Sequence, residues 1–246
     1  MKIKYNTLMD YIKCPAYYKF KHVNKLAPEG IMGREYIWET LLKTVYYFYN
    51  TIKDENRVPK ETEIKEYWAE LYVEKEDELL FKDTSLKRNQ LDSAHEFLKK
   101  FYIKHQYNPG IPVGVDVRYS IRIGNHEIED GYIQLIRVTD GKAQIVYFDN
   151  GTYFPDDFRI KNDMRFTLMA YAYRHIFKKK ENEFLYTHIR KGREINVYRK
   201  QSDFNKLIRM LDNIGNAIEN NLYWQKINYL CKSCPYSEAC TNWDGR

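Results

Sequence analysis

The cysteines of this chain stand only near its two ends, and this limits how it can fold. Cys14 lies in the segment Tyr11–Pro15, whereas Cys231, Cys234 and Cys240 lie together near the other end. Thiolates select zinc or an iron–sulfur cluster, and four of them satisfy either. Short loops join the three clustered cysteines at little closure entropy, so Cys14 would be the remote fourth ligand. The spacing therefore predicts a fold that brings both ends together at one metal centre.

Other uses of the cysteines fit the sequence less well. Unrelated core thiols would not cluster in this way. A structural disulfide is disfavoured because no secretory signal opens the sequence. No apolar run approaches the length of a membrane span, so we expect no membrane partner. We expect a cytoplasmic protein for these two reasons. Abundant Lys, Asn, Ile and Tyr are typical of an AT-rich genome, such as that of a phage or its host, and a phage protein would lie in the host cytoplasm.

Composition leaves the partner open. The 246 residues carry a formal net charge of +6 and include 23 Tyr, 12 Phe and 4 Trp. Such aromatic content with 30% charged residues indicates a folded protein with a polar surface. A mildly basic chain can bind nucleic acid, and its aromatics fit a core as well as they fit base stacking.

Hydrophobic periodicity predicts several helices. Apolar residues recur at three-to-four spacing in 5–26, in three pieces of 33–105, in 160–177, and in a last helix that runs to Leu222. Ser202 is the expected N-cap of that last helix.

The period changes to two after residue 112, which indicates strands. Strict alternation over 113–123, a turn at Gly124-Asn125, a second strand over 126–138 and a third over 143–149 predict a three-stranded antiparallel meander. Two shorter strands, 183–190 and 194–199, flank the turn at Lys191-Gly192.

Together these features resemble a known family. The order of insertion, meander, helix, strand pair, helix and cysteine triplet, with the C-x2-C-P-Y-x3-C pattern of the tail, resembles the iron–sulfur PD-(D/E)XK nucleases. These include the RecB-type nuclease domains and the CRISPR-associated iron–sulfur exonucleases. The resemblance covers the whole chain and implies a single α/β domain with a restriction-endonuclease-like core, a helical insertion at 33–105 and an iron–sulfur tail at 225–246. It implies a [4Fe–4S] cluster on Cys14, Cys231, Cys234 and Cys240, with zinc as the alternative.

The catalytic motifs of that family are altered here. Such enzymes hold Mg²⁺ or Mn²⁺ with two carboxylates and orient the attacking water with a lysine. By the resemblance, the first carboxylate is replaced by Gln134, the second by Tyr147, and the lysine by Asp149, in the run that continues to Gly151. The Gln-x3-Tyr helix motif reads Thr167 to Tyr171 and keeps only the tyrosine. The segment Gly33–Trp38 offers no metal-binding histidine. The resemblance thus implies a dismantled active site, with Mg²⁺ or Mn²⁺ needed only if activity remains.

A working site with relocated ligands is the alternative. The carboxylates on or beside the meander are Asp116, Glu127, Glu129, Asp130 and Asp149, with Lys142 nearby. On an alternating strand Glu127 and Glu129 share one face, while Asp130 lies on the other. A carboxylate on the surface of a strand is usually only a solvated group, so we favour that interpretation for these residues.

The expected partner is DNA, or a protein of a DNA-processing complex. Arg190, Lys191 and Arg193 lie in the turn between the last two strands and could hold phosphates without sequence preference. We therefore expect a catalytically inactive iron–sulfur nuclease homologue. An active deoxyribonuclease and a structural subunit of a larger assembly remain the alternatives.

Overall fold

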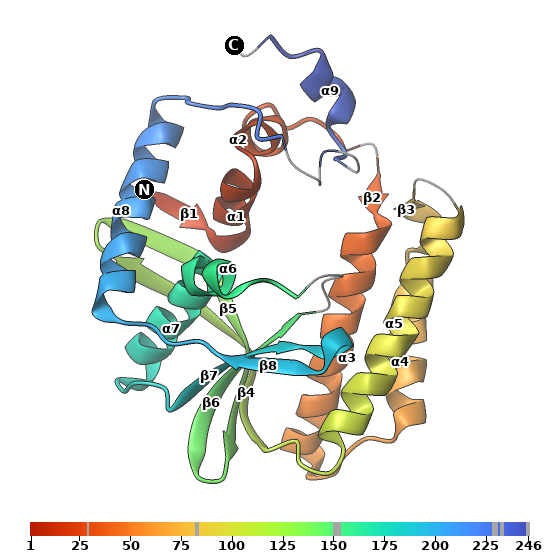
Figure 1. Ribbon diagram of the computed structural model, residues 1–246. Helices are drawn as coiled ribbons and strands as arrows, with labels where there is room; N and C mark the ends of the chain where they lie inside the picture. The colour runs from red at the N-terminus through yellow and green to blue at the C-terminus, as the bar shows by residue number, and fades with distance from the viewer. Residues whose placement is uncertain (29, 82–83, 150–153, 228–230, 232–233, 245–246) are drawn as a thin grey trace.

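A mixed central sheet lies between two layers of helices (Figure 1). The structure is a computed structural model and describes residues 1–28, 30–81, 84–149, 154–227, 231 and 234–244. The predicted mixed α/β class is confirmed. Among the helices of these ranges, none combines the length and the apolar character needed to cross a membrane.

The elements alternate between long helices and a central block of strands. The strands are β1 (Lys2–Lys4), β2 (Ile31–Met32), β3 (Leu79–Leu80), β4 (Ile111–Ile123), β5 (His126–Thr139), β6 (Lys142–Asp149), β7 (Glu183–His188) and β8 (Arg193–Asn196). The α-helices are α1 (Tyr5–Lys13), α2 (Pro15–Tyr18), α3 (Gly33–Glu55), α4 (Glu61–Val73), α5 (Thr84–His105), α6 (Asp157–Asn162), α7 (Met164–Phe177), α8 (Gln201–Glu219) and α9 (Ser237–Thr241). Three shorter helical turns are η1 (Lys19–Val23), η2 (Glu76–Glu78) and η3 (Ile189–Lys191).

The predicted meander forms the middle of the sheet. β4 pairs antiparallel with β5, and β5 pairs antiparallel with β6. β6 then pairs in parallel with β7, and β8 returns antiparallel to β7. On the side of β5 that faces away from β4, β6 covers its second half and β1 pairs in parallel with its first half. A separate parallel pair joins β2, which precedes α3, to β3, which follows α4.

One face of the sheet is covered by α3, α4 and α5, which stand together at the right of Figure 1. Their buried side chains, such as Phe48, Trp68 and Phe101, pack with Leu135 and Phe148 of the sheet. These three helices are the three predicted pieces of 33–105. The apolar stripe of each helix is buried in this core, where α3 and α5 pack against the sheet and α4 packs against α3 and α5.

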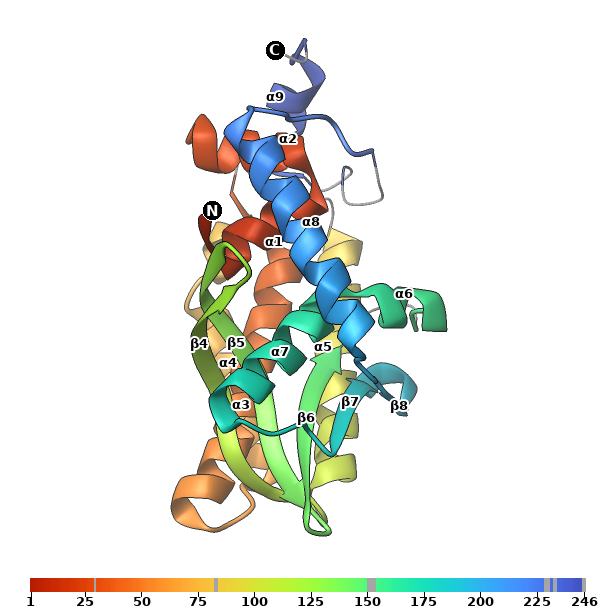
Figure 2. The ribbon, with the colours of Figure 1, turned by 90° about the vertical axis from the view of Figure 1, so that its left-hand side faces the viewer.

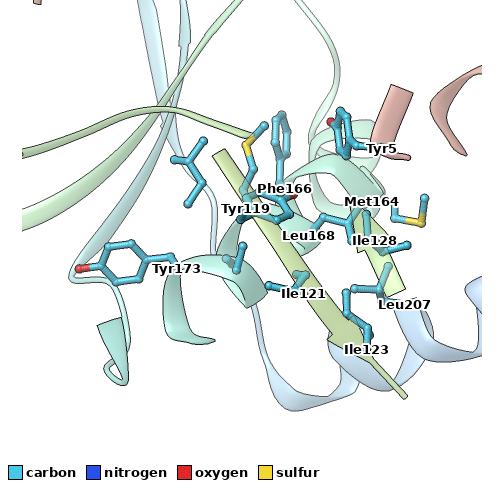
Figure 3. Packing of buried hydrophobic residues seen from close by; sticks show 14 of the residues in the cluster. Tyr5, Tyr119, Ile121, Ile123, Ile128, Met164, Phe166, Leu168, Tyr173 and Leu207 are labelled. Atoms are coloured by element: carbon cyan, nitrogen blue, oxygen red, sulfur yellow. The ribbon is translucent and has the colours of Figure 1, made fainter. Parts of the chain in front are cut away.

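The other face is covered by α7 and α8, with α1 above α7 in the view of Figure 2. Figure 3 shows how side chains of β4, β5, α7 and α8 meet in this core, among them Ile121, Ile128, Leu168 and Leu207. All four are almost completely buried. The two cores lie on opposite faces, so the sheet between them is held from both sides.

Two helix boundaries differ from the prediction. The expected helix 160–177 is divided at Asp163, whose carboxylate accepts a hydrogen bond from the backbone N–H of Arg165 at 2.9 Å and so starts α7 anew. Ser202 is not the cap of the last helix. α8 begins at Gln201, and the backbone N–H of Lys200 donates to Asp203 at 2.8 Å.

The elements near β1 and at the β7–β8 pair also differ from the prediction. The expected helix 5–26 is broken at Cys14, which is extended with φ −165°, so α1 and α2 are separate. The residues before it form β1, a strand that the sequence does not announce. The predicted strand 183–190 ends at His188 because η3 follows it, and 194–199 shortens to Arg193–Asn196.

Candidate metal centre and nucleic-acid interface

The two ends of the chain meet at one pole of the molecule. In Figures 1 and 2, α2 and α9 lie next to each other, although they come from opposite ends of the chain. The Tyr11 hydroxyl donates to the carbonyl of Leu222 at 2.8 Å. The backbone N–H of Ala16 donates to the carbonyl of Trp224 at 3.0 Å. The contact that the cysteine spacing predicts between the ends is therefore present.

All four cysteines line one pocket at this pole. The pocket has a volume of about 330 Å³, and Cys14, Cys231, Cys234 and Cys240 all contribute to its wall. Cys14 reaches it from the break between α1 and α2, while the other three come from the tail. The backbone N–H of Cys234 donates to the carbonyl of Cys231 at 3.3 Å. The structure thus brings together the four residues that the sequence selects.

The pocket has an aromatic floor that the sequence analysis misses. Tyr17, Phe20 and Tyr236 are buried together with Ala16, and the rings of Tyr17 and Tyr236 meet edge to face at 5.2 Å. Cys14, Cys234 and Cys240 pack against this cluster. The signal was present in the aromatic residues that follow Cys14 and Cys234. Such a floor keeps water from one side of the thiols.

The thiols influence one another electrostatically. Burial raises the pKa of the Cys234 thiol above its ordinary value, and the charges of Cys240 and Cys14 raise it further. Burial likewise raises the pKa of Cys240, with the charges of Cys14 and Cys231 adding to it. Four neighbouring thiolates repel, and a cationic centre between them is what would let them ionise together. The donor set therefore fits a metal centre in its chemistry.

The closeness of the thiols decides which centre they could hold. Within the described ranges, no three side chains of Cys, His, Asp or Glu are grouped closely enough to hold one metal ion. Four thiolates on one zinc ion would have their sulfur atoms about 3.8 Å apart, given Zn–S bonds of about 2.3 Å. A cluster of several metal atoms holds its ligands further apart because the metal atoms lie between them.

Gln134, at the expected position of the first carboxylate, has a structural role. It is 1% exposed, and its side-chain oxygen accepts from the backbone N–H of Phe148 at 2.7 Å. The regular β5–β6 pairing includes Leu135 with Val146 but not Gln134. The amide side chain thus continues the pairing of β5 with β6 beyond the regular ladder.

Tyr147, at the second carboxylate position, is also engaged. Its hydroxyl accepts from Nη1 of Arg165 at 2.8 Å, and burial raises its pKa above the ordinary value. Arg165 in turn donates from Nε to Asp163 at 3.0 Å. A buried phenol held by a guanidinium cannot supply the negative charge that a hard cation requires.

Asp149, at the lysine position, belongs to a small polar cluster at the end of β6. Its Oδ2 accepts from the Tyr186 hydroxyl at 2.5 Å and lies 3.9 Å from Nε2 of His188. His188 is fully buried, and its Nδ1 accepts from the backbone N–H of Lys191, which places the ring proton on Nε2. A protonated Nε2 is a donor and not a metal ligand.

Thr167 and Tyr171 hold α7 in place. The Thr167 hydroxyl accepts from Nε of Arg199 at 2.9 Å, and burial lowers the pKa of that arginine. Arg199 also donates to the carbonyl of Ile160 at 3.0 Å. The Tyr171 ring packs on Phe204 of α8. Neither residue lines the pocket of the four cysteines.

The alternative carboxylates of the meander are dispersed among ion pairs. Lys2 of β1 lies 2.9 Å from Glu129 and 3.8 Å from Glu127. Lys4 lies 2.9 Å from Asp130. The remaining pairs are Asp116 with Arg118 at 2.7 Å and Lys142 with Glu183 at 3.6 Å. The parallel pairing of β1 with β5 places lysines beside these carboxylates, which the sequence analysis did not foresee.

The basic turn lies between β7 and β8, as predicted. Lys191 and Arg193 are exposed, Arg190 is half-buried, and Gly192 provides the left-handed turn with φ +62°. Within the described part of the chain, no carboxylate lies within 4 Å of these three cations. Gly151, which completes the altered third-strand motif, lies outside the described residues.

Comparison with known proteins adds little. No family model matches the chain, and no curated protein matches it. Among solved structures, one titled "Crystal structure of SSO0001" aligns with a TM-score of 0.34 and 13% sequence identity, covering 96% of this chain and 95% of that chain. Likeness at this level assigns neither fold family nor function.

Proposed function

We propose that this protein is a catalytically inactive iron–sulfur homologue of the PD-(D/E)XK nucleases that binds DNA. In this proposal, Cys14, Cys231, Cys234 and Cys240 hold a [4Fe–4S] cluster that joins the two ends of the chain. The observation that carries it is the single pocket that all four thiols line. The mixed sheet with its meander and helical insertion agrees with the core that the resemblance implies.

The inactivity follows from the contacts of the altered motifs. Gln134 and Tyr147 are committed to a backbone N–H and to Arg165, and neither carries a negative charge. The carboxylates that could replace them are spread over separate ion pairs. The nucleases of that family hold their catalytic metal ion with two carboxylates. The cluster then serves to hold the fold together.

Anaerobic purification tests the metal centre. We expect a brown protein with about four iron and four sulfide per chain. Cys14→Ala should lose the cluster, whereas a conservative exposed change, Ser120→Ala, should leave the iron content unchanged. A colourless protein with one zinc ion per chain would contradict the cluster assignment.

DNA binding is tested through its salt dependence. Removal of one cation that touches a phosphate should reduce the slope of log K against log salt by about one. We expect weaker binding and a smaller slope when Arg190, Lys191 and Arg193 are all changed to Gln. The matched control changes Lys178, Lys179 and Lys180, three exposed cations after α7, to Gln. Equal reductions in both triple variants would count against the turn as the interface.

Incubation with single- and double-stranded DNA and Mg²⁺ or Mn²⁺ separates this proposal from an active nuclease. We expect no cleavage. Cleavage by the wild type that disappears in Asp149→Asn or Glu129→Gln would replace the proposal with a relocated metal site. Absence of any DNA binding would favour a structural subunit of a larger assembly.

A further inference from the structure

A second pocket lies beside the basic turn. It has a volume of about 540 Å³ and is lined by Phe154, Pro155, Asp156, Asp157, Arg159 and Arg193. Its walls are the segment that leads into α6 and the first residue of β8. Volumes of this order are typical of sites for small ligands. The pocket is far larger than ion binding requires.

Arg193 and Phe154 form a stacked wall of this pocket. The guanidinium carbon of Arg193 lies 4.1 Å from the centroid of the Phe154 ring. Phe154 is fixed from behind, because its ring also packs against Tyr186 and His188 of β7. Flat guanidinium and aromatic groups are the surfaces on which nucleobases stack. The wall is therefore preorganised for a flat aromatic ligand.

The charges of the lining select the kind of ligand. Two arginines and two aspartates contribute equal and opposite formal charge. Nε of Arg159 lies 3.8 Å from Asp156, whereas Arg193 has no carboxylate within 4 Å among the described residues. A balanced lining disfavours a simple anion and favours a ligand that offers both an anionic group and hydrogen-bond donors. A nucleotide offers both, in its phosphate and in its base or sugar.

α6, which contributes two lining residues, also carries an exposed aromatic side chain. Phe158 lies on α6 between the lining residues Asp157 and Arg159 and is 75% exposed. Such exposure of a large apolar ring has no role in packing. Arg190 and Lys191 lie next to Arg193 in the chain, so a strand that leaves the pocket would meet further cations.

We propose that this pocket binds one nucleotide unit, with the base stacked on the Phe154–Arg193 pair and the phosphate held by Arg159 and Arg193. The donors of the base or sugar face Asp157. This inference rests on the proposed nucleic-acid function, because it gives the basic turn a defined nucleotide contact. The unit is either a free mononucleotide or one residue of a DNA strand.

Calorimetric titration of the full-length protein with dAMP, with inorganic phosphate and with a 5′-phosphorylated oligonucleotide tests the inference. Arg193→Met and Arg159→Met keep an apolar stem and remove the charge. We expect each to weaken dAMP binding by about tenfold or more, because each removes charge-assisted hydrogen bonds to the phosphate. Lys161→Met is the matched control on α6, exposed and outside the pocket lining, and should change binding by less than about twofold.

A separate comparison tests whether the bound nucleotide is part of a DNA strand. If the unit belongs to DNA, the oligonucleotide binds more tightly than the same strand with an abasic residue at its 5′ end, and the difference vanishes in Arg193→Met. A free-nucleotide site shows the dAMP result without this difference. Either result supports the pocket.

Other outcomes overturn it. Inorganic phosphate that binds as tightly as dAMP would make this a plain anion site. If dAMP and the oligonucleotide bind equally well when Arg193 or Arg159 is changed, the inference is wrong. If DNA binding then still depends on Arg190 and Lys191, the proposed function stands without the pocket. Conversely, dAMP binding that needs Arg193, with no oligonucleotide bound, keeps the pocket and rejects the DNA-binding proposal.

Discussion

At the scale of single residues, the positions that the resemblance assigns to catalysis are engaged in holding the fold. Gln134 accepts a backbone hydrogen bond, Tyr147 receives Arg165, and Thr167 receives Arg199. Each of these partners is itself buried or half-buried, so removing one side would leave an unpaired polar group. The residues that stand where the resemblance expects catalytic groups therefore have clear structural roles.

Gln134→Leu tests this structural role. The change leaves the buried N–H of Phe148 without its acceptor, so we expect the free energy of unfolding to fall by about 1–3 kcal/mol. The control Gln201→Leu alters an exposed side chain at the start of α8 and should stay within about 0.5 kcal/mol. Urea denaturation measures both. Equal stability of Gln134→Leu and wild type would show that the hydrogen bond contributes nothing.

His105 makes stability depend on pH. Burial, aided by the charge of Arg137, lowers its pKa from 6.5 to about 3 in the folded protein. The unfolded chain therefore binds a proton that the folded protein excludes, and stability is complete above about pH 6.5 and declines as the pH falls toward 3.

The variant His105→Asn should remove this decline. Its side-chain oxygen can still accept from Tyr49, whose hydroxyl lies 3.1 Å from Nδ1 of His105. Between pH 6 and pH 4 we expect the wild type to lose up to about 1.4 kcal/mol per pH unit more than the variant. Above pH 7.5 the two pH slopes should coincide, which is the internal control. Parallel curves at low pH would refute the assignment.

At the scale of elements, local signals decided what could be predicted. The stripes of α3, α4 and α5 and the alternation of β4 are long enough to show their periods, and all were found. The division between α6 and α7 was missed because apolar residues Ile160 and Met164 continue the stripe across Asp163. β1 was missed because three residues show no period, and its partner in β5 lies more than a hundred residues away.

Asp163 also has a measurable effect on its helix. Asp163→Ala removes the N-cap of α7 and the carboxylate that orients Arg165, so we expect a loss of about 1–2 kcal/mol. Asp156→Ala removes the corresponding cap of α6, where Asp156 accepts from the N–H of Arg159 at 2.8 Å. Because α6 has six residues and is mostly exposed, this control should cost less. Thermal unfolding measures both variants. A larger drop in the unfolding temperature for Asp156→Ala than for Asp163→Ala would contradict this prediction.

At the scale of the whole molecule, the pocket of thiols joins parts that the sequence keeps furthest apart. Its cysteines could be predicted because their spacing is a local pattern with one remote member. Its floor of Tyr17, Phe20 and Tyr236 could not, since only the folded chain shows which of the 23 tyrosines meet.

A shared centre predicts that the effects of its cysteines do not add. If Cys14 and Cys240 hold one cluster, either alanine variant loses it, and the double variant should be little less stable than each single one. Tyr11→Phe, which removes a separate hydrogen bond to Leu222, should add to the effect of Cys14→Ala only where the ends stay docked without the cluster. Differential scanning calorimetry compares the wild type with the single and double variants. Strict additivity for the two cysteines would mean that they act as independent core thiols.

The docking of the two ends also has a consequence for synthesis. A growing chain emerges from its first residues onward at roughly 5–20 residues per second, so Cys14 waits about ten to forty seconds before Cys231 is made. During that interval its thiol and the nearby ring of Phe20 lack the tail that covers them in the finished protein. A centre held by all four cysteines would therefore assemble only after Cys240 is made, and until Cys231 is made Cys14 is the one thiol on the growing chain.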